Sequence, residues 1–128
     1  MKMVLWIICA MVLSAFSITV SAADGDNAGK TLVHVVTLKF KEGTAADVIK
    51  KIQDEFRALK TKVPEVVTYM GGTNVSKEGK NKGFTHCSVL TFKSEKDLDT
   101  YVASAAHQEF VKLLKESIDD VVVVDFWE

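Results

Sequence analysis

The sequence predicts an α+β domain in which four strands alternate with one long helix and one interrupted helix. Apolar residues alternate with a period of two in four segments, which is typical of strands, and recur at helical spacing in the two segments between them. The resulting order of strand, helix, strand, strand, helix, strand is the split β-α-β arrangement of ferredoxin-like folds. Right-handed crossovers then give an antiparallel sheet of order 4-1-3-2, with the first and third strands central.

The N-terminal segment is expected to lie outside this domain. Lys2 is followed by an apolar stretch over 3–13 and by small residues up to Ala22, which together are typical of a secretory signal peptide over 1–22. The product would then be secreted or periplasmic, with no membrane attachment after cleavage. The alternative is an uncleaved anchor, because the apolar run is close to the ~18-residue lower limit for spanning a bilayer.

The chain left after cleavage excludes several classes of protein. It has 106 of the 128 residues and a formal charge of −2, because the leader removes one of 16 basic residues and none of 17 acidic ones. This balance argues against a nucleic-acid binder, which needs a basic face. Only Cys87 remains once Cys9 is removed, so an internal disulfide is excluded. No His-x-His, His-x-x-x-His or Cys-x-x-Cys pair is present, and we expect no metal site.

The domain begins after a polar, flexible linker over 23–31 and extends over 32–128. The first strand is predicted over 32–40, with apolar residues on both faces. The helix over 48–63 must end before Pro64, because the residue preceding a proline is pushed out of the α region. Thr44, with Asp47 three residues on, resembles a capping box at the start of this helix.

Two strands and the interrupted helix follow. A short strand is expected over 66–70, closed by Gly71 and Gly72. Ser94, followed by Asp97, predicts a cap for the second helix, which is interrupted at 103–106. The other expected elements are a loop over 73–83, a strand over 84–92 and a final strand over 121–127.

The helices of such a domain cover one face of the sheet only. The other face still carries apolar residues, and no further segment of the chain remains to cover it. We therefore expect a homodimer that forms through the open sheet face.

Three histidines and one tyrosine stand at marked places: His34 and His86 on strands, His107 at the helix break, and Tyr101 six residues before it. An imidazole and a phenol together supply a base and an acid or oxyanion donor near neutral pH. That pair suits proton abstraction beside a carbonyl.

Each residue also has an ordinary packing interpretation, since strand histidines are often half-buried and Tyr101 is in line with apolar helix residues. Cys87 alternates to the face opposite His86, which favours a small buried residue over a nucleophile pair.

At these residues the chain resembles a known family. The runs His34-Val35-Val36-Thr37-Leu38-Lys39-Phe40-Lys41, Gly83-Phe84-Thr85-His86 and Ala106-His107-Gln108-Glu109-Phe110, with the closing Val124-Asp125-Phe126, are similar to the stress-responsive A/B barrel (Dabb) family. The resemblance covers nearly all of 32–128. It implies a ferredoxin-like unit that dimerises into an α+β barrel.

The resemblance also implies functions. In a polyketide cyclase of this family, which uses no cofactor, the residue matching His107 is the base and the one matching Tyr101 holds the developing oxyanion. By the same resemblance His34, His86 and Phe56 contact the ligand, although Phe56 lacks the hydroxyl of the tyrosine found there. Two alternatives stay open: a polar pocket for a small ligand with no assigned reaction, and cofactor-free oxidation or haem handling. A ligand site would need a cavity of about 300 Å³ or more around Tyr101 and His107.

Overall fold

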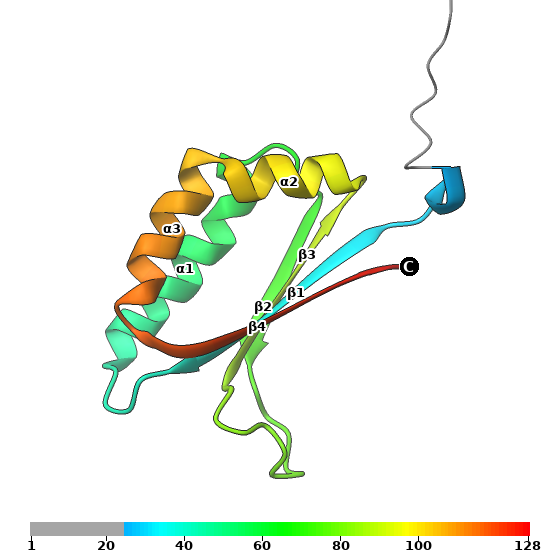
Figure 1. Cartoon of the computed structure of the whole chain (residues 1–128). Helices are drawn as coiled ribbons and strands as arrows, with labels where there is room; N and C mark the ends of the chain where they lie inside the picture. Colours follow the sequence, from blue (N-terminus) through cyan, green and yellow to red (C-terminus); the bar gives the residue numbers. More distant parts are fainter. Residues whose placement is uncertain (1–24) are drawn as a thin grey trace, which may run out of the picture.

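The structure, a computed structural model, describes residues 25–128. A single antiparallel sheet has the strand order β2-β3-β1-β4, which confirms the predicted 4-1-3-2 topology, and the helices lie on one side of it (Figure 1). The elements are a 3₁₀ turn at Gly25–Asn27, β1 at Leu32–Phe40, α1 at Ala46–Lys62, β2 at Thr68–Thr73, β3 at His86–Phe92, α2 at Glu95–Ala103, α3 at Ala105–Lys115 and β4 at Ile118–Trp127.

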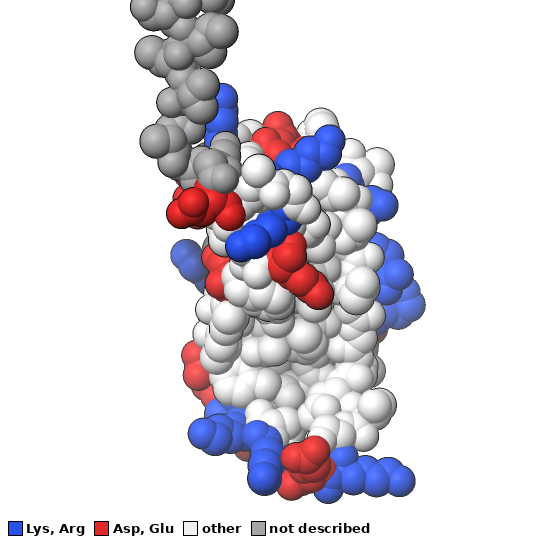
Figure 2. All heavy atoms as spheres, turned by 90° about the vertical axis from the view of Figure 1, so that its right-hand side faces the viewer, with Lys and Arg blue, Asp and Glu red and all other residues white. Residues whose placement is uncertain are grey.

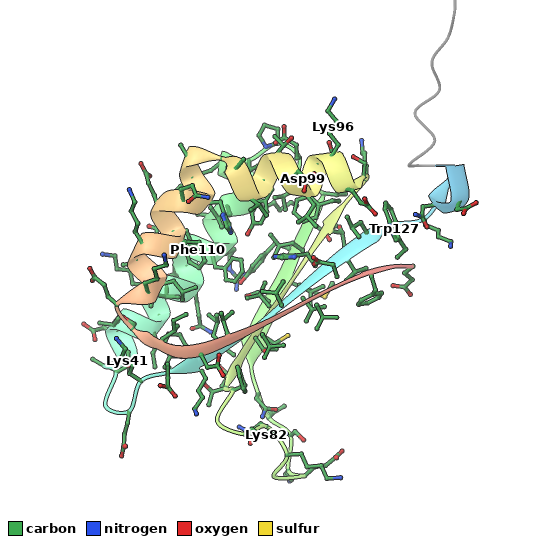
Figure 3. The ribbon with its side chains drawn as sticks, in the orientation of Figure 1. Lys41, Lys82, Lys96, Asp99, Phe110 and Trp127 are labelled. Carbon is green, nitrogen blue, oxygen red and sulfur yellow. The ribbon has the colours of Figure 1, made fainter. Side chains whose placement is uncertain are left out.

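The core lies between the helices and the sheet. Buried apolar side chains of α1 and α3 meet those of the central strands, and Figure 3 shows Phe110 of α3 directed at the sheet. Each such side chain stabilises the fold by roughly 1.5–3 kcal/mol relative to an exposed position. The fully buried members of this core include Ile52, Leu59, Leu90 and Phe92.

Strand register sets one row of side chains across the helix side of the sheet. Tyr69 of β2 is opposite Leu90 of β3, Leu90 is opposite His34 of β1, and His34 is opposite Asp125 of β4. Side chains directly opposite each other on antiparallel strands are in contact distance. Polar residues from both edge strands are therefore aligned with a histidine on a central strand.

The predicted interruption of the second helix is confirmed at Ser104. The hydroxyl of Ser94 accepts a hydrogen bond from the amide of Asp97 at 3.1 Å, which caps α2 as predicted. The hydroxyl of Ser104 does the same for α3, accepting from the amide of His107 at 3.2 Å. A capped second N-terminus stabilises a new helix in place of a continuation of the first.

The predicted cap of α1 is wrong. Ala45 is the N-cap residue and makes no side-chain cap hydrogen bond. The Thr44 hydroxyl instead donates to the carbonyl of Lys41 at 2.7 Å. The Thr44 hydroxyl is therefore bonded within the preceding turn, and the helix begins after Ala45 without a side-chain cap.

The predicted end of the second strand is also wrong. Gly71 and Gly72 lie inside β2, which is shifted toward the C-terminus and pairs as far as Thr73 with His86. Gly71 is needed there because a side chain would meet the Tyr69 hydroxyl at 2.7 Å and the Cys87 carbonyl at 2.9 Å. β3 begins two residues later than predicted, and β4 begins three residues earlier.

The face of the sheet away from the helices is open. Figure 2 views this side and shows an uncharged centre, with lysines and acidic residues gathered toward its two ends. Its apolar side chains include Met70, Val122, Val124 and Phe126, of which Met70 is 62% exposed and Val124 is 51% exposed. An exposed apolar surface with a charged rim is typical of an interface.

The predicted leader over 1–22 lies outside the described residues. Within residues 25–128, no helix combines the length and apolar character needed to span a bilayer.

Gly71 and Gly72 provide a matched pair for testing the packing of β2. We expect Gly71→Ala to lower the free energy of unfolding by about 1–3 kcal/mol, because the added methyl group must displace a backbone carbonyl. Gly72→Ala meets nothing within 4 Å and should change the unfolding free energy by less than about 0.5 kcal/mol. Urea unfolding measures both, and equal effects of the two substitutions would contradict this account.

Candidate functional site

A polar cluster lies between the sheet and the helix break. Its members are His34 of β1, Tyr101 of α2, His107 of α3 and Asp125 of β4. The Tyr101 ring centroid is 4.6 Å from that of His107 and 5.9 Å from that of His34. Three of the predicted site residues are therefore brought together, and Asp125 joins them.

The backbone of α2 selects the tautomer of His107. The Nδ1 atom of His107 is 3.0 Å from the carbonyl oxygen of Val102. A carbonyl oxygen can only accept, so Nδ1 carries the proton and donates it. In the neutral ring Nε2 then has a free lone pair, which is the state required of a general base.

Burial lowers the pKa of His107 below its ordinary value of 6.5. The hydrogen bond to the Val102 carbonyl opposes this shift, and nearby His34 adds to it. Desolvation dominates because it disfavours the charged imidazolium. The ring is therefore neutral at neutral pH, and it is able to accept a proton.

Tyr101 is 1% exposed, and its ring packs against Phe92 at 5.2 Å between centroids. Its hydroxyl makes no hydrogen bond to another described residue, and yet no sealed side-chain polar atom among these residues lacks a partner. The hydroxyl must therefore reach accessible space. Burial, with a smaller effect from Tyr69, raises the pKa of Tyr101 well above its ordinary value, so the phenol keeps its proton and acts as a donor.

His34 is held by Asp125. Its Nδ1 donates to Oδ1 of Asp125 at 2.6 Å, with the histidine side chain 8% exposed and the aspartate 41% exposed. A carboxylate on Nδ1 fixes the ring orientation and leaves Nε2 of His34 as the second nitrogen available inside the cluster.

The two other predicted site residues are His86 and Phe56. His86 pairs across β1 with Leu38, four residues beyond His34, and its ring packs edge-on against Phe40 at 5.1 Å. Burial lowers the pKa of His86. Phe56 is 2% exposed, and its ring lies 4.6 Å from that of Phe110. The register thus separates His86 from His34 along the sheet, whereas Phe56 belongs to the same buried core as Tyr101.

Sequence reasoning did not identify Asp125, Tyr69 or Ser88 as site residues. The Tyr69 hydroxyl lies 3.1 Å from the hydroxyl of Ser88, and the Tyr69 ring is 5.8 Å from Phe56. Tyr69 thus brings a phenol close to the position where Phe56 lacks one. Only strand register, which places Tyr69, His34 and Asp125 in one row, could have revealed these partners.

Two main hollows lie beside the sheet, and neither is lined by Tyr101 or His107. The larger, about 890 Å³, is a groove between the open face and the β2–β3 loop, where His86, Cys87, Lys80 and Lys82 line it. The smaller, about 380 Å³, lies on the helix side and includes Asp125. Neither hollow is therefore the cavity expected around Tyr101 and His107, and this expectation is not met. The larger groove belongs to the open face, whereas the acid–base residues converge on the helix side, where the smaller hollow lies.

Among residues 25–128, no group of three histidine, cysteine, aspartate or glutamate side chains is arranged to hold a metal ion. His34 and His107 each use one ring nitrogen for a protein partner.

A four-stranded antiparallel sheet with helices on one face defines the class of ferredoxin-like α+β proteins. The family model of the Stress responsive A/B Barrel Domain matches residues 32–128, and the chain belongs to this family. This confirms the resemblance seen in the sequence. The stress-response A/B barrel domain-containing protein HS1 of Arabidopsis thaliana is 30% identical over 93 residues, covering 73% of this chain and 85% of that protein. Olivetolic acid cyclase of Cannabis sativa is 23% identical over 93 residues, covering 73% and 92%.

Solved structures agree with this assignment. A hydroxynitrile lyase from Passiflora edulis is 25% identical with a TM-score of 0.72, over 77% of this chain and 93% of that chain. A dimeric ferredoxin-like protein of unknown function from Jannaschia sp. CCS1 is 26% identical with a TM-score of 0.66, over 75% and 97%. The chain thus shares its fold with enzymes and with proteins of unknown function.

The depressed pKa of His107 predicts a pH-dependent stability. The unfolded chain binds this proton more tightly than the folded protein, so the unfolding free energy should fall as the pH drops below about 6.5. The decline should end once His107 is protonated in the folded state. His107→Gln should reduce the slope between about pH 5.5 and 6.5, where the remaining share comes from His86, whose pKa is also lowered; Glu55, held by Lys62, contributes at lower pH. Urea unfolding between pH 4.5 and 7.5 measures the slope, and an NMR titration of His107 with its midpoint above 6.5 would contradict the account.

Proposed function

We propose that this protein binds a small, oxygen-bearing molecule between the sheet and the helix break, where Tyr101 and His107 hydrogen-bond to it. The proposal rests on two hydrogen-bonding groups of neighbouring rings, the Tyr101 hydroxyl and the His107 Nε2. These two atoms make no hydrogen bond to other described residues, and neither atom is sealed from accessible space, so both are free to meet a ligand. A ligand oxygen could accept a hydrogen bond from the Tyr101 hydroxyl. A neighbouring hydroxyl or acidic C–H of the same ligand could then donate to Nε2 of His107.

Acid–base catalysis is a second candidate, and the tautomer of His107 favours it. A neutral histidine with a free Nε2 can remove a proton, and a protonated phenol can stabilise the oxyanion that forms. Relatives named as a cyclase and as a hydroxynitrile lyase support a reaction of this kind. The chain's own residues would supply both roles without a cofactor.

The open face supports a homodimer as part of the proposal. Val122, Val124 and Phe126 of β4 would be covered by a second copy, and several structural neighbours are described as dimeric ferredoxin-like proteins. β4 is exposed on both of its faces, since Val121 and Val123 on the helix side are also exposed. Export by the predicted leader would place this dimer outside the cytoplasm.

Tyr101→Phe separates binding from packing. The Tyr101 hydroxyl has no hydrogen-bond partner among the described residues, so its removal should change the unfolding free energy by less than about 0.5 kcal/mol. The same variant should lose the stabilisation that pentane-2,4-dione or mandelonitrile gives the wild type, which is about 2.7 kcal/mol at 100 times Kd. Thermal unfolding with and without each compound measures both effects, and His86→Gln is the matched histidine control outside the cluster.

The same compounds distinguish the two candidate functions. If the protein is an enzyme, wild type should convert one of them, and His107→Gln should lower the rate by about 10²–10⁴-fold. If it is a binding protein, the wild type gains stability and converts neither. Retained ligand stabilisation in both Tyr101→Phe and His107→Gln would refute the proposed site.

Light scattering at micromolar concentration tests the dimer. We expect a dimeric mass for the wild type and a monomeric mass for Val124→Asp, because a charge would be buried at the centre of the interface. Val102→Asp is the matched control, since Val102 is similarly exposed but lies on α2. A monomeric wild type would refute the dimer.

A further inference from the structure

The helix side of the sheet carries a second feature beside the polar cluster. A cavity of about 380 Å³ lies between the N-terminal part of α2 and the C-terminal end of β4. Figure 3 shows Asp99 on α2 and Trp127 on β4 on this same side of the molecule. The cavity is lined by three acidic residues, Glu95, Asp99 and Asp125, and by Leu32, Leu98, Phe126 and Trp127.

We propose that this cavity is the entrance through which a ligand reaches His34 and Tyr101, and that its carboxylates select uncharged or cationic molecules over anions. The inference rests on the proposed ligand site and names the charge class of its ligand. It applies to small carbonyl compounds and amines, and it disfavours carboxylates and phosphate-bearing thioesters.

Asp125 connects the cavity to the cluster. Asp125 is a lining residue of the cavity, and its Oδ1 accepts the hydrogen bond from His34 at 2.6 Å. The His34 ring in turn contacts Tyr101 at 5.9 Å between centroids. Leu98 of the cavity wall precedes Tyr101 by three residues on α2, so the two side chains lie on one helix face, one turn apart.

Tyr101 does not itself line the cavity, but its hydroxyl is not sealed from accessible space. Tyr101 is 1% exposed, and its hydroxyl has no hydrogen-bond partner among residues 25–128. The partner of such a group must come from outside the described chain. Asp125, which is 41% exposed, brings solvent nearest to the buried His34.

The charged residues that line the cavity are all acidic. Three of the seven lining residues are acidic, and none is lysine or arginine. Neither Glu95 nor Asp99 takes part in an ion pair within the described part of the chain. Two or three carboxylates at roughly 8 Å from an anion disfavour its presence by roughly tenfold in a water-like dielectric at low ionic strength, at which the alkylation rates are compared.

Alkylation of His34 by iodoacetamide and by iodoacetate tests the entrance without knowledge of the ligand. The two reagents are nearly isosteric, but the second is an anion. We expect iodoacetamide to modify His34 of the full chain roughly tenfold faster, relative to the ratio of the two rates at free histidine. Peptide mass spectrometry measures each histidine separately. His86, whose groove is lined by Lys80 and Lys82, should show no preference for the neutral reagent.

Two sets of variants test separately the charge selection and the access of reagents to His34. Glu95→Gln with Asp99→Asn should reduce the tenfold preference at His34 to about twofold. The matched control is Asp97→Asn with Glu109→Gln, which removes the same charge outside the cavity and should keep the preference. Leu98→Trp should slow both reagents several-fold, whereas Val102→Trp, away from the cavity, should not.

Each outcome decides the inference. Equal relative rates at His34, or a preference unchanged in the Glu95→Gln and Asp99→Asn variant, would overturn the charge selection. No alkylation of His34 by either reagent, or no effect of Leu98→Trp, would overturn the entrance. The proposed function has its own test in the response of Tyr101→Phe to ligand, so the two can fail independently.

Discussion

Ser104 joins the two residues on which the candidate site depends. Its hydroxyl donates to the carbonyl of Tyr101 at 2.7 Å and accepts from the amide of His107 at 3.2 Å. In one continuous helix, side chains six residues apart would point roughly 120° away from each other. The break at Ser104 removes this separation and brings the two rings to 4.6 Å. It also directs the carbonyl of Val102 to the Nδ1 of His107.

The sheet supplies the other half of the site through its register. β1 is central and pairs with both β3 and β4, so His34 is held on a strand that cannot shift without breaking two ladders. Asp125 reaches His34 because β4 is aligned with β1 at that row. The two-layer fold thus confines the polar cluster to one side, while the apolar open face remains for a partner.

The sequence was sufficient to predict the topology, the central strands, the Ser94 cap and the helix break. Period and helix-capping signals are local, and the structure follows them at these places. Gly71 and Gly72 were misleading because glycine marks both turns and close packing in strands. Here Gly71 leaves space for the Tyr69 hydroxyl. Thr44 was misleading because its hydroxyl donates within the preceding turn.

The site was only partly predictable for a different reason. His34, Tyr101 and His107 were recognised by chemical type and by family resemblance, and they converge in the structure. The roles of Asp125, Tyr69 and Ser88 depend on cross-strand neighbours, which cannot be assigned before the register is known. The separation of His86 from the cluster follows from the same register.

The chemistry of the site depends on a bare Nε2 of His107, whose ring lies 4.6 Å from that of Tyr101. Long-range proton–nitrogen NMR correlation of the His107 ring at neutral pH tests it directly, since the two neutral tautomers have different nitrogen shifts. The account predicts a protonated Nδ1, as required by its hydrogen bond to Val102, and an unprotonated Nε2. A ring protonated at Nε2 at neutral pH would contradict it.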